Sequence, residues 1–296
     1  MSTATRTTVI GFCTDPGPRE TNQDAVREVL LPGEGWLLAV ADGMGGLEAG
    51  EVASRLVLDV VEQRVTSGSP LGQAIRSANA ALHLRADGEA MGTTLVAAMA
   101  EGARVRIASV GDSRAYYVDS LGISQITSDH TVAAEAAVNA PFAGDQVAAT
   151  RWGGTLTRSL GLDSTVEVDE FGPMSLEAGS WLVLCTDGVY KSVPDIEIER
   201  CVAEGPDATA VAEKLVALAL ERGTDDNATA AVVQIPGPRT TLTGGKSGRA
   251  ATTPWDPGQF LVPSGGQRYR KIMMILAALF ATVLVVIVVA SVILVK

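Results

Sequence analysis

The chain has 296 residues, of which 47% are hydrophobic, and a formal net charge of −11. This length allows one large domain or two small ones with an ample buried core. The negative charge argues against nucleic-acid binding, which needs a basic face to neutralise phosphates. The cysteines are odd in number and widely spaced, at Cys13, Cys185 and Cys201. This spacing predicts buried thiols in a reducing compartment, not a disulfide framework or a zinc site.

The N-terminal half predicts strands followed by two helices. Residues 1–8 are polar and only the short apolar strand Val9–Phe12 follows them, so no signal peptide is visible. A run without charges at Leu37–Ala41 predicts a buried strand. Apolar residues then recur at helical spacing over 52–61 and 71–84, which predicts two amphipathic helices.

Short connections between later apolar runs predict antiparallel hairpins, because a parallel link would need a crossover of about a dozen residues or more. Further strands are expected at 93–99, 105–110, 115–118, 123–126, 166–171, 181–186 and from Ala228. Asp207 and Gly223 flank the helical pattern Ala208–Glu221 and predict its two caps. Without regular strand–helix alternation, these elements indicate an α+β fold in which helices cover antiparallel sheets.

The C-terminal part predicts a membrane anchor. Residues 236–271 are rich in Gly, Pro, Ser and Thr, which is typical of a flexible linker. Residues 272–295 carry no charge and could cross a hydrocarbon core of roughly 30 Å, a buried core helix being the alternative. Arg268, Arg270 and Lys271 precede this stretch, so residues 1–235 are expected on the cytoplasmic side of a single-pass membrane protein.

Carboxylates follow or precede several apolar strands. Asp42-Gly43 comes after the run at 37–41, Asp187 and Asp112 follow other strands, and Asp226 stands just before the last one. A single Asp-Gly after a strand is usually only a turn. Four such sites in a chain with two histidines favour an oxygen-ligand site for Mg²⁺ or Mn²⁺, assembled from distant strand ends.

A cysteine-dependent phosphatase loop is a weaker alternative. Cys13 and Arg19 have the C-x5-R spacing of such a loop, whose backbone N–H groups bind phosphate beside an ionised thiol. Pro16 and Pro18 have no N–H, and Asp15 would repel both the thiolate and the phosphate. The residues between the cysteine and the arginine therefore argue against this chemistry.

A series of motifs stands in a specific order along the chain. They are Arg19-x-x-Asn22-Gln23-Asp24, Asp42-Gly43-Met44-Gly45-Gly46, Gly92-Thr93-Thr94, Gly111-Asp112-Ser113-Arg114, Asp129-His130-Thr131, Thr157-Arg158-Ser159-Leu160-Gly161, Thr186-Asp187-Gly188 and Asp226-Asn227. With these motifs, residues 8–235 resemble the metal-dependent Ser/Thr protein phosphatases of the phosphatase-2C type (PPM), in their bacterial form. The ordered set is far more specific than any one motif.

The resemblance implies a four-layer αββα sandwich with two central antiparallel sheets and a metal centre at one edge. Asp42 would bridge two Mn²⁺ or Mg²⁺ ions, and Gly43 would contribute its carbonyl oxygen. Asp187 and Asp226 would complete the shell of the first metal. Asp112 matches the position that holds a third, weaker metal in bacterial members.

The resemblance also implies how phosphate is bound and hydrolysed. Arg19 would bind the substrate phosphate, and Asp24 would lie nearby, orienting waters or the arginine. A water activated by two metal ions would attack phosphorus in line. Met44 stands where eukaryotic relatives often have His, so proton donation to the leaving group falls to metal-bound water or to His130, for which a structural hydrogen-bonding role is the alternative. The segment 131–154 matches the family's flap in position but is Ala-rich.

Two functional hypotheses follow. The first is a membrane-tethered phosphatase that acts on phosphoserine and phosphothreonine in proteins and opposes a membrane Ser/Thr protein kinase. The second is a non-catalytic metal-binding scaffold or regulatory pseudophosphatase at the membrane. Because the expected carboxylates and Arg19 are all present, the first hypothesis is favoured.

Overall fold

The computed structural model of the chain describes residues 8–237 except for 34, 47, 102–103, 140–146, 149 and 151. Within these residues the apolar runs form two antiparallel sheets, which we call sheet A and sheet B. Sheet A has the order β1 (Val9–Asp15), β11 (Ala228–Gln234), β10 (Trp181–Cys185), β7 (Arg114–Asp119), β8 (Gly122–Gln125). Sheet B has the order β2 (Asp24–Leu31), β3 (Gly35–Gly45), β5 (Leu95–Glu101), β6 (Arg104–Val110), β9 (Asp169–Ser175), and β4 (Met91–Thr93) pairs with the end of β3.

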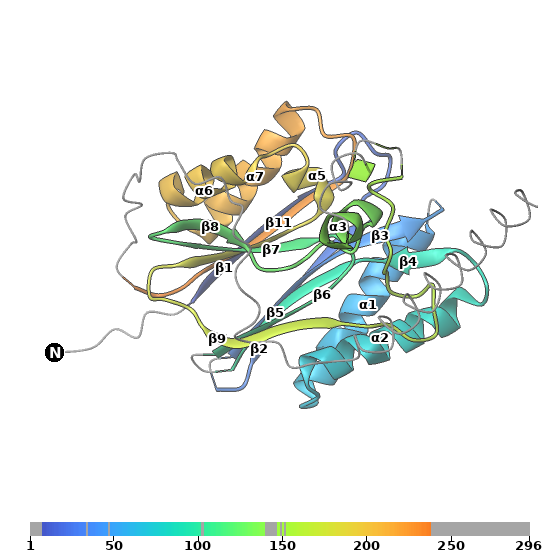
Figure 1. Cartoon of the computed structure of the whole chain (residues 1–296). Coiled ribbons are helices and arrows are strands. Elements are labelled where there is room, and N and C mark those ends of the chain that lie inside the picture. Colours follow the sequence, from blue (N-terminus) through green and yellow to red (C-terminus); the bar gives the residue numbers. More distant parts are fainter. Residues whose placement is uncertain are drawn as a thin grey trace, which may run out of the picture. The chain divides into compact units, whose positions relative to one another are not determined.

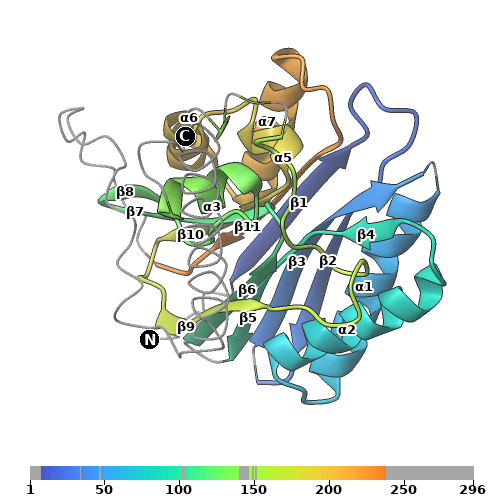
Figure 2. The ribbon, with the colours of Figure 1, turned by 45° about the vertical axis from the view of Figure 1, so that its right-hand side comes forward.

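Helices cover the outer face of each sheet, as Figures 1 and 2 show. The helices over sheet B are α1 (Ala49–Thr66) and α2 (Leu71–Ala86). Those over sheet A are α5 (Asp187–Tyr190), α6 (Asp195–Glu204) and α7 (Ala208–Glu221). A further helix, α3 (Val132–Asn139), lies between β8 and β9 in the chain. The described residues thus form the helix–sheet–sheet–helix layers that the family resemblance implies.

Strand β3 shows why its sequence has no polar alternation. Leu37 and Ala39 pack with α1 and α2, while Leu38 and Val40 pack with Leu184 and other residues between the two sheets. These four side chains of β3, and that of Leu184, are essentially inaccessible to solvent. Because successive side chains of a strand point to opposite faces, a strand buried on both faces is apolar at every position.

The structure extends and corrects the sequence prediction in several places. The helix expected at 208–221 has these bounds, and Asp207 caps it by accepting a hydrogen bond from the backbone N–H of Ala210 at 2.9 Å. The strand expected at 166–171 begins three residues later, at Asp169. Strand β2 and helix α6 were not predicted.

The predicted membrane anchor remains a prediction. None of the helices in the described part of the chain is long and apolar enough to span a membrane. The linker beyond residue 237 and the span at 272–295 lie outside the described residues.

The strand registers bring the predicted site residues to one end of both sheets. In sheet B, Asp24 at the start of β2 pairs with Asp42 near the end of β3. In sheet A, Cys185 at the end of β10 pairs with Ala230 near the start of β11, which puts Asp187 beside Asp226. The carboxylates that precede or follow these strands therefore gather at a common edge, as the sequence pattern predicted.

Candidate metal centre

Asp42 is held by two threonines of the Gly92-Thr93-Thr94 motif. The hydroxyl of Thr94 accepts a hydrogen bond from the backbone N–H of Asp42 at 3.0 Å, and the hydroxyl of Thr93 donates to the Asp42 carbonyl at 2.8 Å. The Thr94 hydroxyl also bonds the hydroxyl of Ser113 at 2.7 Å. Both threonines are buried. The motif thus fixes the backbone of Asp42 and links it to the loop that carries Asp112.

Gly43 lies where any side chain would collide with backbone. A Cβ atom built on Gly43 would lie 2.0 Å from the carbonyl oxygen of Gly50 and 2.7 Å from that of Gln23. The backbone N–H of Gly43 donates to this Gln23 carbonyl at 3.1 Å. This close approach of three backbone segments explains why glycine follows Asp42.

Asp24 is buried directly beside Asp42. The hydroxyl of Thr186 donates to Asp24 Oδ2 at 2.8 Å and accepts from the backbone N–H of Thr229 at 3.1 Å. Burial is the largest cause of a raised pKa at Asp24, and the charges of Asp187 and Asp226 add to it. The carboxyl of Asp24 therefore binds its proton more tightly than an ordinary aspartate does.

Asp42 and Asp112 also resist ionisation. Burial raises the pKa of Asp42 well above its ordinary value, and Asp24, Asp187, Asp112 and Asp226 raise it further by charge repulsion. Burial and Asp187 likewise raise the pKa of Asp112 to about 6. Asp187 Oδ1 is buried and has no hydrogen-bond partner. Crowded carboxylates with a free oxygen are the donor set that hard divalent cations bind, so these residues fit Mn²⁺ or Mg²⁺.

Two side-chain cations already contact this cluster. Lys191 Nζ lies 2.5 Å from Asp187 Oδ2, and Arg19 donates to Asp226 Oδ2 at 3.0 Å. Across the residues that the structure describes, no group of three or more His, Cys, Asp and Glu side chains is arranged to hold a metal ion as it stands. The lysine and the arginine thus carry part of the positive charge that the carboxylates require.

The loop that carries Arg19 is fastened by Asn227. The Asn227 amide donates to the carbonyls of Pro16 at 2.8 Å and Thr21 at 3.0 Å, and its oxygen accepts from the backbone N–H of Gln23 at 2.9 Å. Arg19 itself donates to the Asp225 carbonyl at 2.7 Å. These bonds place the guanidinium, which is half exposed, beside Asp226. A cavity of about 250 Å³ is lined here by Arg19, Glu20, Thr21, Gln23, Gly45 and Asn227.

Asp112 is connected through the ring of Tyr190 to Asp129, which lies just before the segment 131–154. The hydroxyl of Tyr190 donates to Asp112 Oδ2 at 3.3 Å. The guanidinium of Arg114 stacks on the Tyr190 ring, 3.7 Å from its centre, and forms two hydrogen bonds with the carboxylate of Asp129. Such a bidentate pair fixes the plane of the guanidinium and with it the ring. Tyr190 is therefore held in position to orient Asp112.

His130 lies in a buried hydrogen-bond network next to this loop. Its Nδ1 accepts from the backbone N–H of Gly111 at 3.0 Å, so Nε2 carries the proton and donates to Asp169 Oδ2 at 3.1 Å. Arg158 donates to the other oxygen of Asp169 at 2.7 Å. Both ring nitrogens of His130 are therefore engaged: Nδ1 holds Gly111, the residue before Asp112, and Nε2 is bound to Asp169. These contacts fit a structural hydrogen-bonding role for His130, which the sequence analysis gave as the alternative to proton transfer.

The cysteine-phosphatase alternative finds no geometry to support it. Cys13 lies within β1, opposite Ala230 of β11, and packs against the core between sheet A and its helices. Burial raises the pKa of the Cys13 thiol, and nearby Glu213 and Asp15 raise it further. A nucleophilic cysteine needs a lowered pKa.

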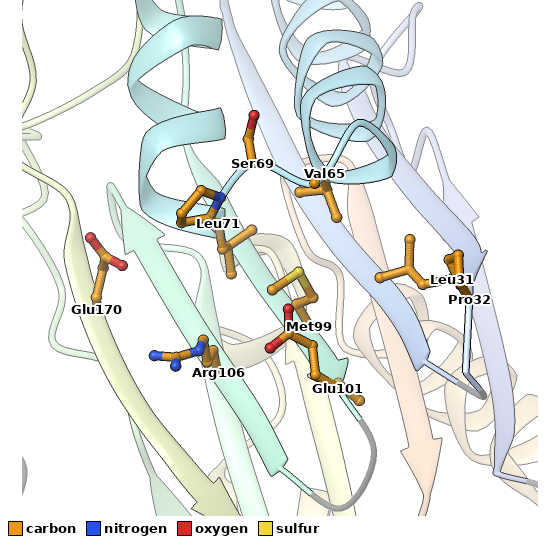
Figure 3. Close-up of a pocket in the computed structure, with 12 residues that line it drawn as sticks. Leu31, Pro32, Val65, Ser69, Leu71, Met99, Glu101, Arg106 and Glu170 are labelled. Carbon is orange, nitrogen blue, oxygen red and sulfur yellow. The ribbon is translucent and has the colours of Figure 1, made fainter.

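A larger cavity, of about 470 Å³, lies at the opposite end of sheet B. Figure 3 shows Met99 and Leu71 in its interior, with Arg106 and Glu170 extending from β6 and β9 at one side. None of its lining residues belongs to the motifs or to the carboxylate cluster. The candidate site is therefore identified by the chemistry of its side chains and not by the size of its cavity.

Two stacked antiparallel sheets with crowded carboxylates at one edge and an adjacent arginine are features of metal-dependent phosphohydrolases. The family model of protein phosphatase 2C matches residues 19–217. A serine/threonine phosphatase of Listeria monocytogenes is 31% identical over 212 residues, which cover 67% of this chain and 84% of that protein. The chain belongs to the protein phosphatase 2C family.

Solved structures agree with this assignment. The serine/threonine phosphatase Stp1 from Staphylococcus aureus has a TM-score of 0.70 and 32% identity, covering 77% of this chain and 95% of that one. The catalytic domain of the phosphatase PstP, in complex with two manganese ions, has a TM-score of 0.64 and 30% identity over 77% and 98% of the two chains. Identity at this level extends the likeness from the fold to the family.

Several residues of the centre were not singled out from the sequence. Thr93, Thr94 and Asn227 occur in the motifs quoted above, but their roles depend on hydrogen bonds between segments far apart in the chain. Tyr190 and Lys191 follow the Thr186-Asp187-Gly188 motif, with only Val189 between. Lys191 could have been predicted from its position four residues after Asp187, because residues four apart on a helix are neighbours.

Proposed function

We propose that this chain is a metal-dependent serine/threonine protein phosphatase with its centre at the edge formed by Asp42, Asp187 and Asp226. The observation that carries the proposal is the convergence of buried and half-buried, mutually repelling carboxylates at the positions of the family motifs. Asp42, Gly43, Asp187 and Asp226 would hold the Mn²⁺ or Mg²⁺ ions, and Asp112 would be a ligand of any weaker position. Such ions supply an activated water and neutralise charge on the phosphoryl group.

The chain's own residues bind and orient the phosphate. Arg19 lines the smaller cavity, where its guanidinium, which contacts Asp226, would bind the phosphate oxygens of the substrate. Asn227 keeps the Arg19 loop in place by its hydrogen bonds to Pro16 and Thr21. Asp24, buried beside Asp42, orients groups at the centre by hydrogen bonding. His130 holds the turn before Asp112, with proton transfer as its alternative role.

The substrates are phosphorylated proteins, and we propose that they include a membrane Ser/Thr protein kinase. The support is the charge-free stretch 272–295 with basic residues before it, which favours a single membrane span and a cytoplasmic catalytic domain. A membrane tether raises the local concentration of a kinase in the same membrane.

The test is hydrolysis of a phosphothreonine peptide by the full chain with Mn²⁺ and with chelator. Three variants accompany it: Asp42→Asn, Arg19→Ala and Cys13→Ser. We expect activity that needs Mn²⁺, is lost with Asp42→Asn, falls strongly with Arg19→Ala and is unchanged with Cys13→Ser. Activity that survives chelation but needs Cys13 would overturn the proposal, and a complete lack of activity on varied phosphopeptides would favour the scaffold.

A further inference from the structure

The C-terminal end of helix α5 contacts two of the carboxylates, through Tyr190, its last residue, and Lys191, which caps it. Tyr190 donates to Asp112 Oδ2, and Lys191 donates to Asp187 Oδ2. Asp112 and Asp187 come from different sheets, following β6 and β10. One oxygen of each carboxylate is thereby occupied by a group at the end of the same short helix.

The Lys191 ammonium acts on more than its hydrogen-bond partner. Its charge interacts with Asp112 and Asp42 as well as with Asp187. The side chain of Asp187 is 13% exposed, whereas that of Lys191 is 56% exposed, so the lysine reaches into the cluster from its solvent side. An ammonium in this position supplies the kind of charge that a cation bridging Asp112 and Asp187 would supply.

The remaining oxygen of Asp187 has no hydrogen-bond partner. Asp187 Oδ1 is buried and has no hydrogen-bond partner, whereas Oδ2 is bound to Lys191. With Oδ2 taken, Asp187 has Oδ1 to offer to the principal metal centre. With Asp112 Oδ2 bound to Tyr190, both carboxylates have lost donor capacity toward a cation between them.

We propose that Tyr190 and Lys191 take the place of the weakly held cation between Asp112 and Asp187, so that this centre operates with the two ions at Asp42. The inference rests on the proposed function, because it takes Asp112 and Asp187 as metal ligands. Tyr190 and Lys191 then compete with added Mn²⁺ for the carboxylates of Asp112 and Asp187. A charge-assisted hydrogen bond that must be broken for an ion to bind weakens that ion's affinity by roughly ten- to a hundredfold.

The test counts Mn²⁺ ions bound to the full chain, using the electron paramagnetic resonance signal of free Mn²⁺ during titration. Lys191→Met removes the ammonium and keeps most of the stem, and Tyr190→Phe removes only the hydroxyl. Lys214→Met is the matched control, because Lys214 pairs with Glu204 at 2.8 Å and both side chains are largely exposed. We expect the Tyr190→Phe/Lys191→Met variant to bind one more Mn²⁺ than wild type, or its weakest Mn²⁺ about tenfold tighter. Lys214→Met should match wild type.

Adding Asp112→Asn to the double variant should remove the extra or tightened ion, which locates it. Each single variant should show part of the gain, so one poorly folded variant leaves the other to decide. Titration curves of the double variant and wild type that superimpose would overturn the inference while leaving the two-metal function intact. A wild-type chain that binds no Mn²⁺ and hydrolyses no phosphopeptide would instead overturn the proposed function, and the inference with it.

Discussion

Asp24 offers a quantitative test of the electrostatics of the metal-free centre. Burial raises its pKa from 3.8 to about 7, because hydrogen bonds from Thr229 and Thr186 offset only part of the lost hydration. Asp24→Asn keeps the shape of the side chain and removes its ionisation. We expect this variant, in the presence of chelator, to be more stable than wild type at pH 8.

The sign follows from proton binding. Well below pH 3.8, Asp24 is protonated in both the folded and the unfolded chain, so wild type and variant should be similar in stability there. Between pH 4 and 7 the unfolded carboxyl ionises while the folded one holds its proton, so wild type loses stability as the pH rises through the folded pKa. A proton held about a thousandfold more tightly corresponds to roughly 4 kcal/mol at pH 8, which is an upper limit because the fold can relax.

The assay is urea unfolding of wild type and Asp24→Asn at pH 4, 5, 6, 7 and 8 with chelator present. Asp87→Asn is the control, because Asp87 is exposed and its left-handed backbone, with φ of 45°, tolerates Asn. The reasoning is refuted if the stability difference between Asp24→Asn and wild type stays constant from pH 4 to pH 8, or if the control shows the same rise.

Three further predictions concern the scaffold of the site. Thr94→Val should lower the free energy of unfolding by about 1–3 kcal/mol, because the buried N–H of Asp42 loses its acceptor; urea unfolding measures this, and Thr94→Ser should restore most of it. Burial would raise the pKa of Asp169, but hydrogen bonds from His130 and Arg158 outweigh it and lower that pKa. Asp169→Asn should therefore destabilise the fold at pH 7, and the difference from wild type should disappear as the pH falls through the lowered pKa of Asp169. Thermal unfolding across pH 3–7 tests this. Asp207→Ala should cost about 1 kcal/mol through loss of the α7 cap and leave peptide hydrolysis unchanged.

Local patterns predicted most of the elements because their signals are local. Strand β3 is apolar throughout, and α7 has its own caps, so each could be recognised without its partners. Strand β2 was missed because it is an edge strand of sheet B, and Arg27 and Glu28 interrupt its apolar pattern. Edge strands tolerate such charges, since one side of the ladder is open.

Helix α6 was missed for a different reason. Ile196 and Ile198 alternate with Glu197 and Glu199, which is the period of a strand. Pro194 before the first turn and the acidic residues within it outweigh that alternation, because they favour a helix start. Packing of Ile198 against the core of sheet A then stabilises the helix, while Ile196 stays exposed.

The site was predictable as a set of carboxylates but not as a network. The Asp residues could be recognised in the sequence because each lies next to an apolar strand. The bonds that connect Thr94 to Asp42, or Tyr190 to Asp112, join residues more than fifty positions apart. Only the register of the sheets brings such partners together, and no local pattern encodes it.

The pairing of the first and last strands has a consequence for synthesis. Strand β1 is at the edge of sheet A and is hydrogen-bonded only to β11, the last strand described. Arg19, just after β1, bonds Asp225 and Asp226, just before β11. A nascent chain that has not yet reached Ala228 therefore holds β1 without its neighbouring strand and Arg19 without either acceptor. The fold around Arg19 is completed only when β11 has emerged from the ribosome, so translation itself sets when dephosphorylation can begin.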